Sequence, residues 1–354
     1  MKAGGFVDPC MEALPLATRN FILATYIASL STGKTLLGIH IRSRTLRHYN
    51  SDACALFRLR GIAYTNDIIT DYVKLMLSAA KRYESIPNRR HMISDEMRRH
   101  LYKRARETGP DSIEAAIFDW ITFGCYTGFR RSEAFQTTQT KYERVLDHPD
   151  QPARALILED LLFFDHRKRL LKGKDITKDR VWYVRVVYRF QKNGDNGEET
   201  DFARDTANPR FCPVLAAWRI YDRALRLEVP AGEPIAVYSN KGKRRFITDS
   251  LIQKHLRVAA KKVHKITDKK VLQRWSTHSI RVTAANLLHR ANMADSFIQI
   301  RLRWKSTSFL MYLRNTFYSA ARHTNALNVS ESNLPPSGSR ACRPREAHEA
   351  VTHS

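Results

Sequence analysis

The sequence predicts a mainly α-helical protein with a small β-sheet, made of an all-helical N-terminal domain and a larger α+β domain. In residues 19–83, apolar residues recur at three- and four-residue spacing, and the region shows no clear strand signal. Further along, "VWYVRVVYRFQ" (residues 181–191) is rich in β-branched and aromatic residues. The turn-forming "KNGDNGEE" follows it, and "TDFAR" can return as a second strand, so a β-hairpin is expected there.

The domain boundaries follow from breaks in these patterns. The stretch "SIPNRRHMI" (residues 85–93) contains a proline and a basic pair and interrupts the helical pattern, which indicates a linker. After about Ser330 the chain is rich in Ser, Pro, Arg and Glu with few large apolar residues, which is typical of disorder. We therefore expect an irregular lead (1–16), a helical domain (17–86), a linker (87–93), an α+β domain (94–325) and a disordered tail (326–354).

Helix-capping signals predict the ends of several helices in the second domain. Asp111 and Glu114 resemble a capping box at the start of one helix, and Gly128 is suited to its end. Pro213 fits the first position of another helix. Thr248 or the residue after it is expected to cap a strongly basic helix.

The charge of the chain points to a polyanionic partner. Sixty Lys and Arg residues against thirty-five Asp and Glu give a net charge of +25. Nucleic acid is the commonest partner for such an excess, and two basic domains on a linker could close around a duplex of DNA. An anionic membrane surface is the alternative, but no apolar run approaches the roughly twenty residues of a spanning helix.

The cysteines and histidines give no sign of a metal site or a cofactor. The five cysteines are scattered without a C-x-x-C pair, and the histidines lack ligand spacing. The cysteine pattern suits a reducing compartment, so we expect an intracellular protein that is not secreted and that lies with the genome, in the nucleus if the host is a eukaryote.

The segment "RWKSTSFLMYLRN" (residues 303–315) contains a candidate nucleophile, Tyr312. A tyrosine that attacks a phosphodiester needs fixed cations for the charge on the non-bridging oxygens, and arginine suits this role. It also needs a proton donor for the leaving 5′ oxygen and a base or cationic field for its own hydroxyl.

The rest of the chain contains these groups in order. "TGFRRSEAF" places Arg130 between a helix end and a helix start, and "STHSIRVTAANLLHR" places His278 and Arg281 three residues apart, before an amphipathic helix. Lys192 lies at the tip of the expected hairpin, and Trp304 provides an indole N–H beside the tyrosine.

Taken singly, each candidate also has a structural explanation. Tyr312 lies on an apolar helical stripe, Trp304 fits a partly buried core position, and Lys192 fits a solvated hairpin. Arg130 fits a solvated basic turn, and His278 fits a capping histidine. Their joint occurrence, in order, on a chain of this charge favours a functional interpretation.

The ordered motifs resemble those of the tyrosine recombinase, or phage-integrase, family. "TGFRRSE" is similar to its first arginine box, "HSIR" to its His-x-x-Arg box, and "RWKSTSFLMYLRN" to its nucleophile segment. "AAKRYESIPNRRHMIS", "QKNGDNGEE" and "FCPV" resemble the branch found in eukaryotic mobile elements, such as tyrosine-recombinase retrotransposons and cryptons. The resemblance covers roughly residues 19–318.

The resemblance implies a fold, a reaction and a set of roles. It implies a helical core-binding domain and a catalytic domain that cleaves and rejoins DNA through a 3′-phosphotyrosyl bond, as a homotetramer and without cofactor or metal. The implied roles are phosphate binding for Arg130 and Arg281, support of the first box for Glu133, protonation of the leaving oxygen for Lys192, proton transfer and phosphate binding for His278, a supporting ring for Trp304, and nucleophilic attack for Tyr312.

Three alternatives remain open at this point. The chain can be a domesticated DNA-binding protein of the same fold that has no catalytic activity. It can also be an enzyme like the type IB topoisomerases, which share the chemistry but relax DNA as monomers. Within the recombinase interpretation, Tyr318 is a second candidate nucleophile if the segment is registered differently.

Overall fold

A computed structural model describes residues 11, 13–33, 41–59, 71–84, 89–146, 148, 150–191 and 194–313. Several features expected from the sequence lie outside these residues. They are most of the lead, part of the linker, the hairpin residue Lys192, the second tyrosine Tyr318 and the whole tail at 326–354.

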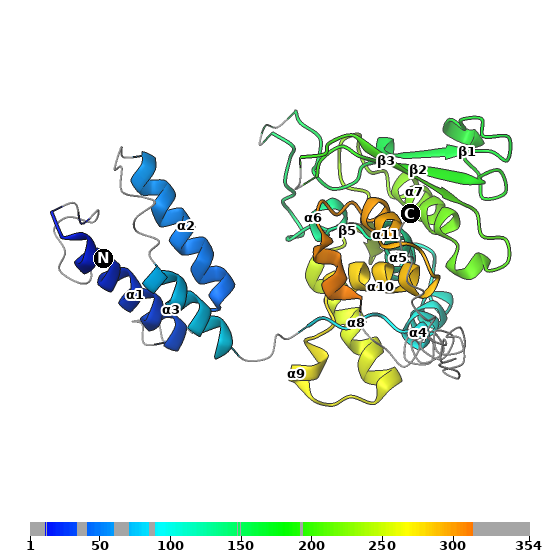
Figure 1. The fold of residues 1–354 in the computed structure, drawn as a ribbon. Coiled ribbons are helices and arrows are strands. Elements are labelled where there is room, and N and C mark those ends of the chain that lie inside the picture. Colours follow the sequence, from blue (N-terminus) through cyan, green and yellow to red (C-terminus); the bar gives the residue numbers. More distant parts are fainter. Residues whose placement is uncertain are drawn as a thin grey trace, which may run out of the picture. The chain divides into compact units, whose positions relative to one another are not determined.

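The chain divides into two compact units, residues 1–89 and residues 90–354. The described part of the first unit is helical, with α1 (Leu16–Thr32), α2 (Ser43–Leu59) and α3 (Asp71–Arg82) (Figure 1). Leucine, isoleucine and valine side chains from all three helices form its core: Leu23, Ile27, Leu30, Leu46, Val73 and Leu77.

The second unit combines helices with two small antiparallel sheets, which confirms the predicted fold class. Its helices are α4 (Asp95–Arg106), α5 (Ile113–Thr127), α6 (Arg131–Ala134), α7 (Pro213–Arg226), α8 (Asp249–His264), α9 (Lys269–Leu272), α10 (His278–Arg290) and α11 (Asp295–Arg301). Its strands are β1 (Leu161–Phe164), β2 (Tyr183–Tyr188), β3 (Glu198–Ala203), β4 (Val237–Asn240) and β5 (Lys243–Phe246). Short 3₁₀ turns are η3 (Leu158–Asp160), η4 (Gly173–Asp175), η5 (Pro209–Phe211) and η6 (Thr307–Tyr312).

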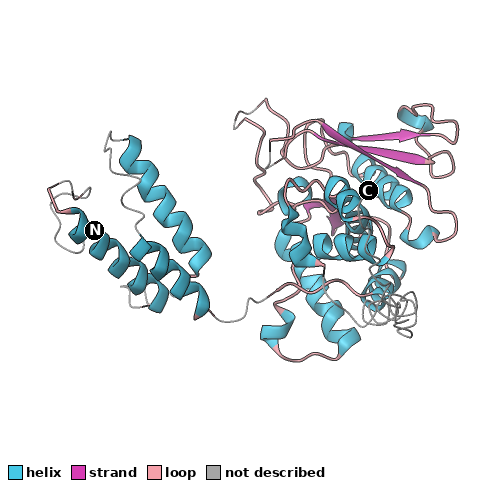
Figure 2. Ribbon diagram, viewed as in Figure 1, coloured by secondary structure: helices cyan, strands magenta, loops and turns pink. Residues whose placement is uncertain are grey.

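The predicted hairpin is present as β2 and β3, which pair from Tyr183–Ala203 to Tyr188–Glu198 (Figure 2). β1 joins the free edge of β2, and β4 pairs with β5 in a separate sheet. The sequence analysis did not single out β1, β4 or β5. Each has four residues, too few for alternation to stand out.

The predicted helix ends are mostly confirmed, with one correction. The N-cap of α5 is Ser112, whose hydroxyl accepts a hydrogen bond from the N–H of Ala115 at 3.2 Å, so Asp111 is not the cap. The Asp111 carboxylate instead pairs with Arg226, the last residue of α7, at 2.7 Å. Gly128 ends α5 with a left-handed φ of 54°, and Thr248 caps α8.

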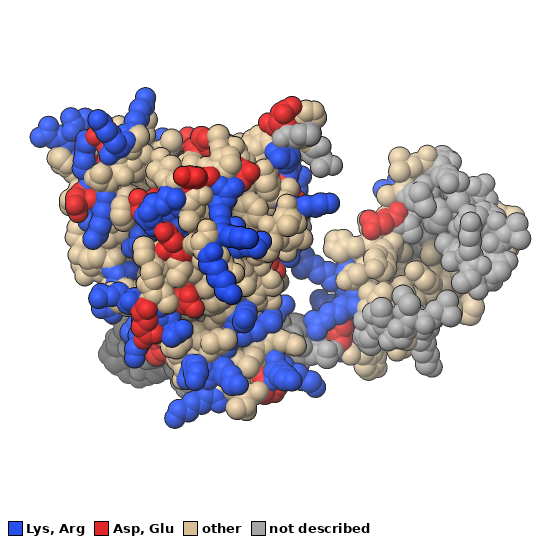
Figure 3. Space-filling model, turned by 180° about the vertical axis from the view of Figure 1, so that it is seen from behind, with Lys and Arg blue, Asp and Glu red and all other residues tan. Residues whose placement is uncertain are grey.

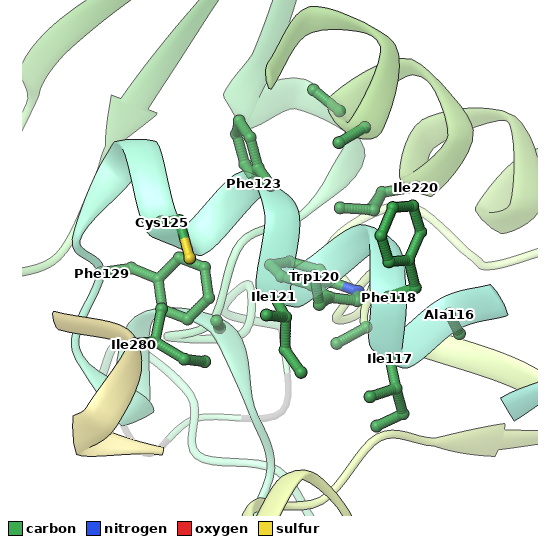
Figure 4. Close-up of a cluster of buried hydrophobic side chains, with 14 of the residues drawn as sticks. Ala116, Ile117, Phe118, Trp120, Ile121, Phe123, Cys125, Phe129, Ile220 and Ile280 are labelled. Atoms are coloured by element: carbon green, nitrogen blue, oxygen red, sulfur yellow. The ribbon is translucent and has the colours of Figure 1, made fainter. Parts of the chain in front are cut away.

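Helix α5 is buried along nearly its whole length and packs against α4, α7 and α10 (Figure 1). The indole ring of Trp120, in α5, meets the Phe129 ring edge-on, with ring centres 5.7 Å apart. Figure 4 shows Phe129 and Ile280 beside this helix. A Cβ atom on Gly124 would lie 2.5 Å from Ile280 Cγ2 and 2.7 Å from Phe129 Cζ. The missing side chain therefore lets α10 and the loop after α5 approach the same point of the helix.

Gly128 makes a second close approach possible. A Cβ atom there would lie 2.6 Å from Leu302 Cδ2, so the end of α11 packs directly on this glycine. Leu302, like Phe129 and Ile280, is fully buried and is followed by an arginine. The packing around α5 thus fixes the backbone positions of three arginines, Arg130, Arg281 and Arg303.

We predict that Gly124→Ala destabilises the protein although alanine favours helices. The added Cβ would force apart Ile280 and Phe129, and overpacking of this kind costs about 1–3 kcal/mol. Chemical denaturation measures the change. Gly109→Ala is the matched control, because a Cβ there meets nothing within 4 Å and should leave stability unchanged or slightly raised. Equal stability of the two variants would contradict the proposed close packing.

Candidate functional site

Two arginines from distant parts of the sequence are anchored side by side. Arg281, in the first turn of α10, donates to the carbonyls of Gly128 and Leu302, both at 2.7 Å. Arg130, just before α6, donates to the carbonyl of Arg303 at 3.2 Å. Because Leu302 and Arg303 are consecutive, the two guanidinium groups are held next to each other.

Glu133 links this pair to a third arginine. One oxygen of its buried carboxylate, Oε1, accepts from Arg130 Nη1 at 2.9 Å. The other, Oε2, accepts from the backbone N–H of Arg130 and from Arg303 Nη2, both at 2.8 Å. A single carboxylate therefore fixes Arg130 at its backbone and at its side chain.

The site has an excess of buried positive charge. Arg281 is 4% exposed and has no carboxylate partner within the described part of the chain. Its burial, and next the charge of Arg130, lower the pKa of Arg281 to about 9, so it is still protonated at pH 7. Buried charges are normally compensated, and arginine forks match the oxygens of phosphate or carboxylate. The excess therefore favours binding of an anion.

A stack of aromatic rings places Tyr312 beside these arginines. The Arg281 guanidinium lies 4.3 Å from the centre of the Trp304 ring. Trp304 stacks on Tyr312 with ring centres 5.6 Å apart. Asn286 of α10 donates to the Tyr312 carbonyl at 2.8 Å, which ties η6 to α10. The indole of Trp304 thus contacts both the Tyr312 phenol ring and the Arg281 guanidinium.

His278 also lies against the ring of Tyr312. Its ring meets the Tyr312 ring in a T-shaped contact at 5.1 Å. The sequence analysis placed His278 and Arg281 before the helix; both lie within its first turn instead, because α10 begins at His278. This position still directs both side chains toward one point, since residues three apart share a helix face.

The surroundings of His278 keep its imidazole neutral at pH 7. Desolvation by the surrounding chain, and then the charges of Arg281 and Arg90, lower the pKa of His278 to about 4. The residue is exposed at the surface of the site, so water moderates the size of this shift. A neutral imidazole next to a phenol can accept its proton.

The β2–β3 hairpin reaches the site through the residue before Lys192. Gln191 is buried, and its Oε1 accepts from Arg130 Nη1 at 3.4 Å. On the far side of the turn, Asp195 pairs with Lys305, the residue after Trp304, at 2.7 Å. Both described ends of the hairpin turn therefore touch segments of the site, while the role of Lys192 stays a prediction.

Two contributors were missed by the sequence analysis. Gln191 gave no signal, because it looked like one more hairpin residue. Arg303 was quoted only as part of the "RWKSTS" stretch, although its side chain is completely buried and pairs with Glu133. An arginine directly before the candidate Trp304 was the available signal.

The second unit carries many basic side chains on its surface. On the face shown in Figure 3, Lys and Arg side chains are spread over much of the second unit, with fewer Asp and Glu between them.

Among the described residues, no group of three or more His, Cys, Asp or Glu is placed to hold a metal ion. None of the helices described is long and apolar enough to cross a membrane.

Comparisons with known proteins give structural likeness only. No family model matches the chain, and no curated protein matches it. Similar solved structures include the Tn1549 transposon integrase with transposon right-end DNA, at 12% identity over 90% of this chain and 87% of that one, with a TM-score of 0.45. A lambda integrase dimer bound to a COC′ core site is 16% identical over 89% of this chain and 85% of that one, with a TM-score of 0.43. XerA recombinase is 15% identical over 88% of this chain and 90% of that one, with a TM-score of 0.38. The functional assignment therefore depends on the residues of the site.

We predict that His278 titrates well below an ordinary histidine. Its pKa is lowered in the folded protein, so the unfolded chain takes up this proton first as the pH falls. The folded state therefore loses stability from about pH 6.5, the usual histidine pKa, downward. NMR titration of the ring protons measures the pKa, and His278→Gln identifies the signal. A His278 signal that titrates at pH 6.5 or above would contradict this prediction.

Proposed function

We propose that the protein is a DNA strand-transfer enzyme of the tyrosine recombinase type, a site-specific recombinase or integrase. The observation that carries this proposal is the stacking of Tyr312 on Trp304, beside the anchored guanidinium groups of Arg281 and Arg130. A phenol next to a partly buried cationic pair has the two features that phosphodiester cleavage by tyrosine needs: a nucleophile and compensation for the transition-state charge.

In the proposed reaction, Arg130 and Arg281 bind the non-bridging oxygens of the scissile phosphate. The Tyr312 oxygen attacks phosphorus while its proton passes to the neutral imidazole of His278. The bond from phosphorus to the 5′ oxygen breaks, and Lys192 donates a proton to that oxygen. The products are a 3′-phosphotyrosyl bond and a free 5′ hydroxyl.

Rejoining is the same reaction in reverse. The 5′ hydroxyl of a partner strand attacks the phosphotyrosyl bond, and Tyr312 leaves with its proton restored. Because each phosphodiester is exchanged for a bond of similar energy, the cycle requires no input of free energy from ATP. The geometry needs only positioning and electrostatics, as is general for phosphoryl transfer.

The partner and its arrangement follow from the same proposal. The net charge of +25 suits double-stranded DNA, which the helical first unit and the second unit would bind together. Strand exchange between two duplexes calls for four active sites, and hence a homotetramer. Because its motifs resemble those of the eukaryotic mobile-element branch, we propose that the protein belongs with that branch and acts on the genome inside the cell.

We predict that Tyr312→Phe abolishes covalent attachment to DNA without unfolding the protein. The change removes one oxygen from a ring that keeps its stacking on Trp304, so the loss of stability should be about 1 kcal/mol or less. A nicked suicide duplex traps the covalent complex, which a denaturing gel detects. Duplex affinity and the thermal melt should stay close to wild type.

Tyr318→Phe is the control for this experiment. If the adduct survives in Tyr312→Phe and disappears in Tyr318→Phe, the nucleophile is Tyr318. If the wild type forms no adduct on any duplex, the enzyme assignment is wrong, and a non-catalytic DNA-binding protein is favoured instead.

We predict that Lys192→Ala blocks cleavage of an ordinary duplex but not of one with a 5′-thio leaving group. A thiolate leaves without protonation, so it does not need a general acid. The adduct rate on the two substrates measures the difference. Equal impairment on both would show that Lys192 acts in binding and not in proton transfer.

A further inference from the structure

Arg303 has an unusual backbone for its residue type. At the end of α11 its φ is 56°, and the N–H of Trp304 closes the turn on the carbonyl of Gln299 at 2.9 Å. This left-handed conformation is the usual place for glycine, because any side chain carries a steric cost there. An arginine in this position suggests that the side chain itself is needed.

The side chain of Arg303 is buried, and both of its terminal nitrogens are hydrogen-bonded. The Arg303 side chain is 0% exposed, and its Nη2 pairs with Glu133 at 2.8 Å. Its Nη1 donates to the carbonyl of Thr127 at 3.2 Å, and its guanidinium lies 3.4 Å from the centre of the Tyr188 ring. Arg303 therefore connects α5, β2 and the candidate site.

The charge of Arg303 prevents Glu133 from fully neutralising Arg130. If Glu133 faced Arg130 alone, the pair would be neutral and would attract a phosphate only weakly. Glu133 instead divides its two oxygens between Arg130 and Arg303, so the three groups together keep a net positive charge. The carbonyl of Arg303 also accepts from Arg130, which fixes the direction of that guanidinium.

We propose that Arg303 is a positioning residue of the phosphate site. Its guanidinium takes up the charge of Glu133, and its carbonyl orients Arg130, so that Arg130 and Arg281 stay available to an anion. This inference rests on the proposed strand-transfer function and adds a residue to it. The competing explanation is that position 303 serves only as the left-handed turn after α11.

Glycine separates the two explanations, because it suits the turn better than arginine and lacks the guanidinium. With Arg303→Gly, we expect adduct formation at saturating nicked duplex to slow by roughly 100-fold, the effect of a misplaced reacting group. Arg303→Lys retains the charge and should lie between this variant and wild type. Lys265→Gly is the matched control, since Lys265 ends α8 with a φ of 53°; its rate should equal wild type.

A double variant tests the electrostatic part. Glu133→Gln removes the negative charge that would neutralise Arg130, so Arg303→Gly with Glu133→Gln should react faster than Arg303→Gly alone. If Arg303 has only a structural role, the double variant will be slower than either single change. Thermal melts of all variants establish that the assay temperature lies below unfolding.

The outcomes are distinct. Wild-type rate in Arg303→Gly, or a double variant slower than Arg303→Gly, overturns the inference and leaves the proposed function intact. If Arg303→Gly does not fold, Arg303→Lys replaces it: a rate below wild type in a folded Arg303→Lys supports the inference, and a wild-type rate overturns it. Absence of any adduct from wild type overturns the proposed function, and the inference falls with it.

Discussion

The close packing on helix α5 is the constraint on which the site depends. Gly124 admits Ile280 and Phe129, and Gly128 admits Leu302, at distances that no side chain would allow. The residue after each of these apolar side chains is an arginine. Core packing therefore sets the spacing of three guanidinium groups, although the segment of Arg130 is more than a hundred residues away from those of Arg281 and Arg303. Protein interiors are rigid enough to hold such a spacing.

Electrostatics then determines what this arrangement can bind. Arg130 and Arg303 share the single carboxylate of Glu133, while Arg281 has no carboxylate partner among the described residues, and burial lowers the pKa of Arg281 to about 9. Such an arrangement is unfavourable when empty and is relieved by an anion with several oxygens. The cost of holding the cations close together is met by the apolar contacts around α5, which are made whether or not a ligand is bound.

The aromatic residues connect this charge to a possible reaction. Trp304 contacts both the Arg281 guanidinium and the Tyr312 ring, so it links the cationic pair to the phenol. His278 also contacts the phenol ring, and desolvation, followed by the charges of Arg281 and Arg90, lowers the pKa of its imidazole. Arg281, which suits a phosphate, thus also helps to keep the candidate proton acceptor neutral.

The sequence by itself determined the fold class, the β2–β3 hairpin and the cap residues Gly128 and Thr248, because periodicity and turn chemistry are local. It also gave the candidate site residues, because the motifs that contain them and the order of those motifs can be read without knowing which residues are in contact. Only the tertiary structure decided that Asp111 pairs with Arg226 and that Arg303 and Gln191 reach Arg130. Those facts depend on contacts between residues far apart in the chain, which no local pattern encodes.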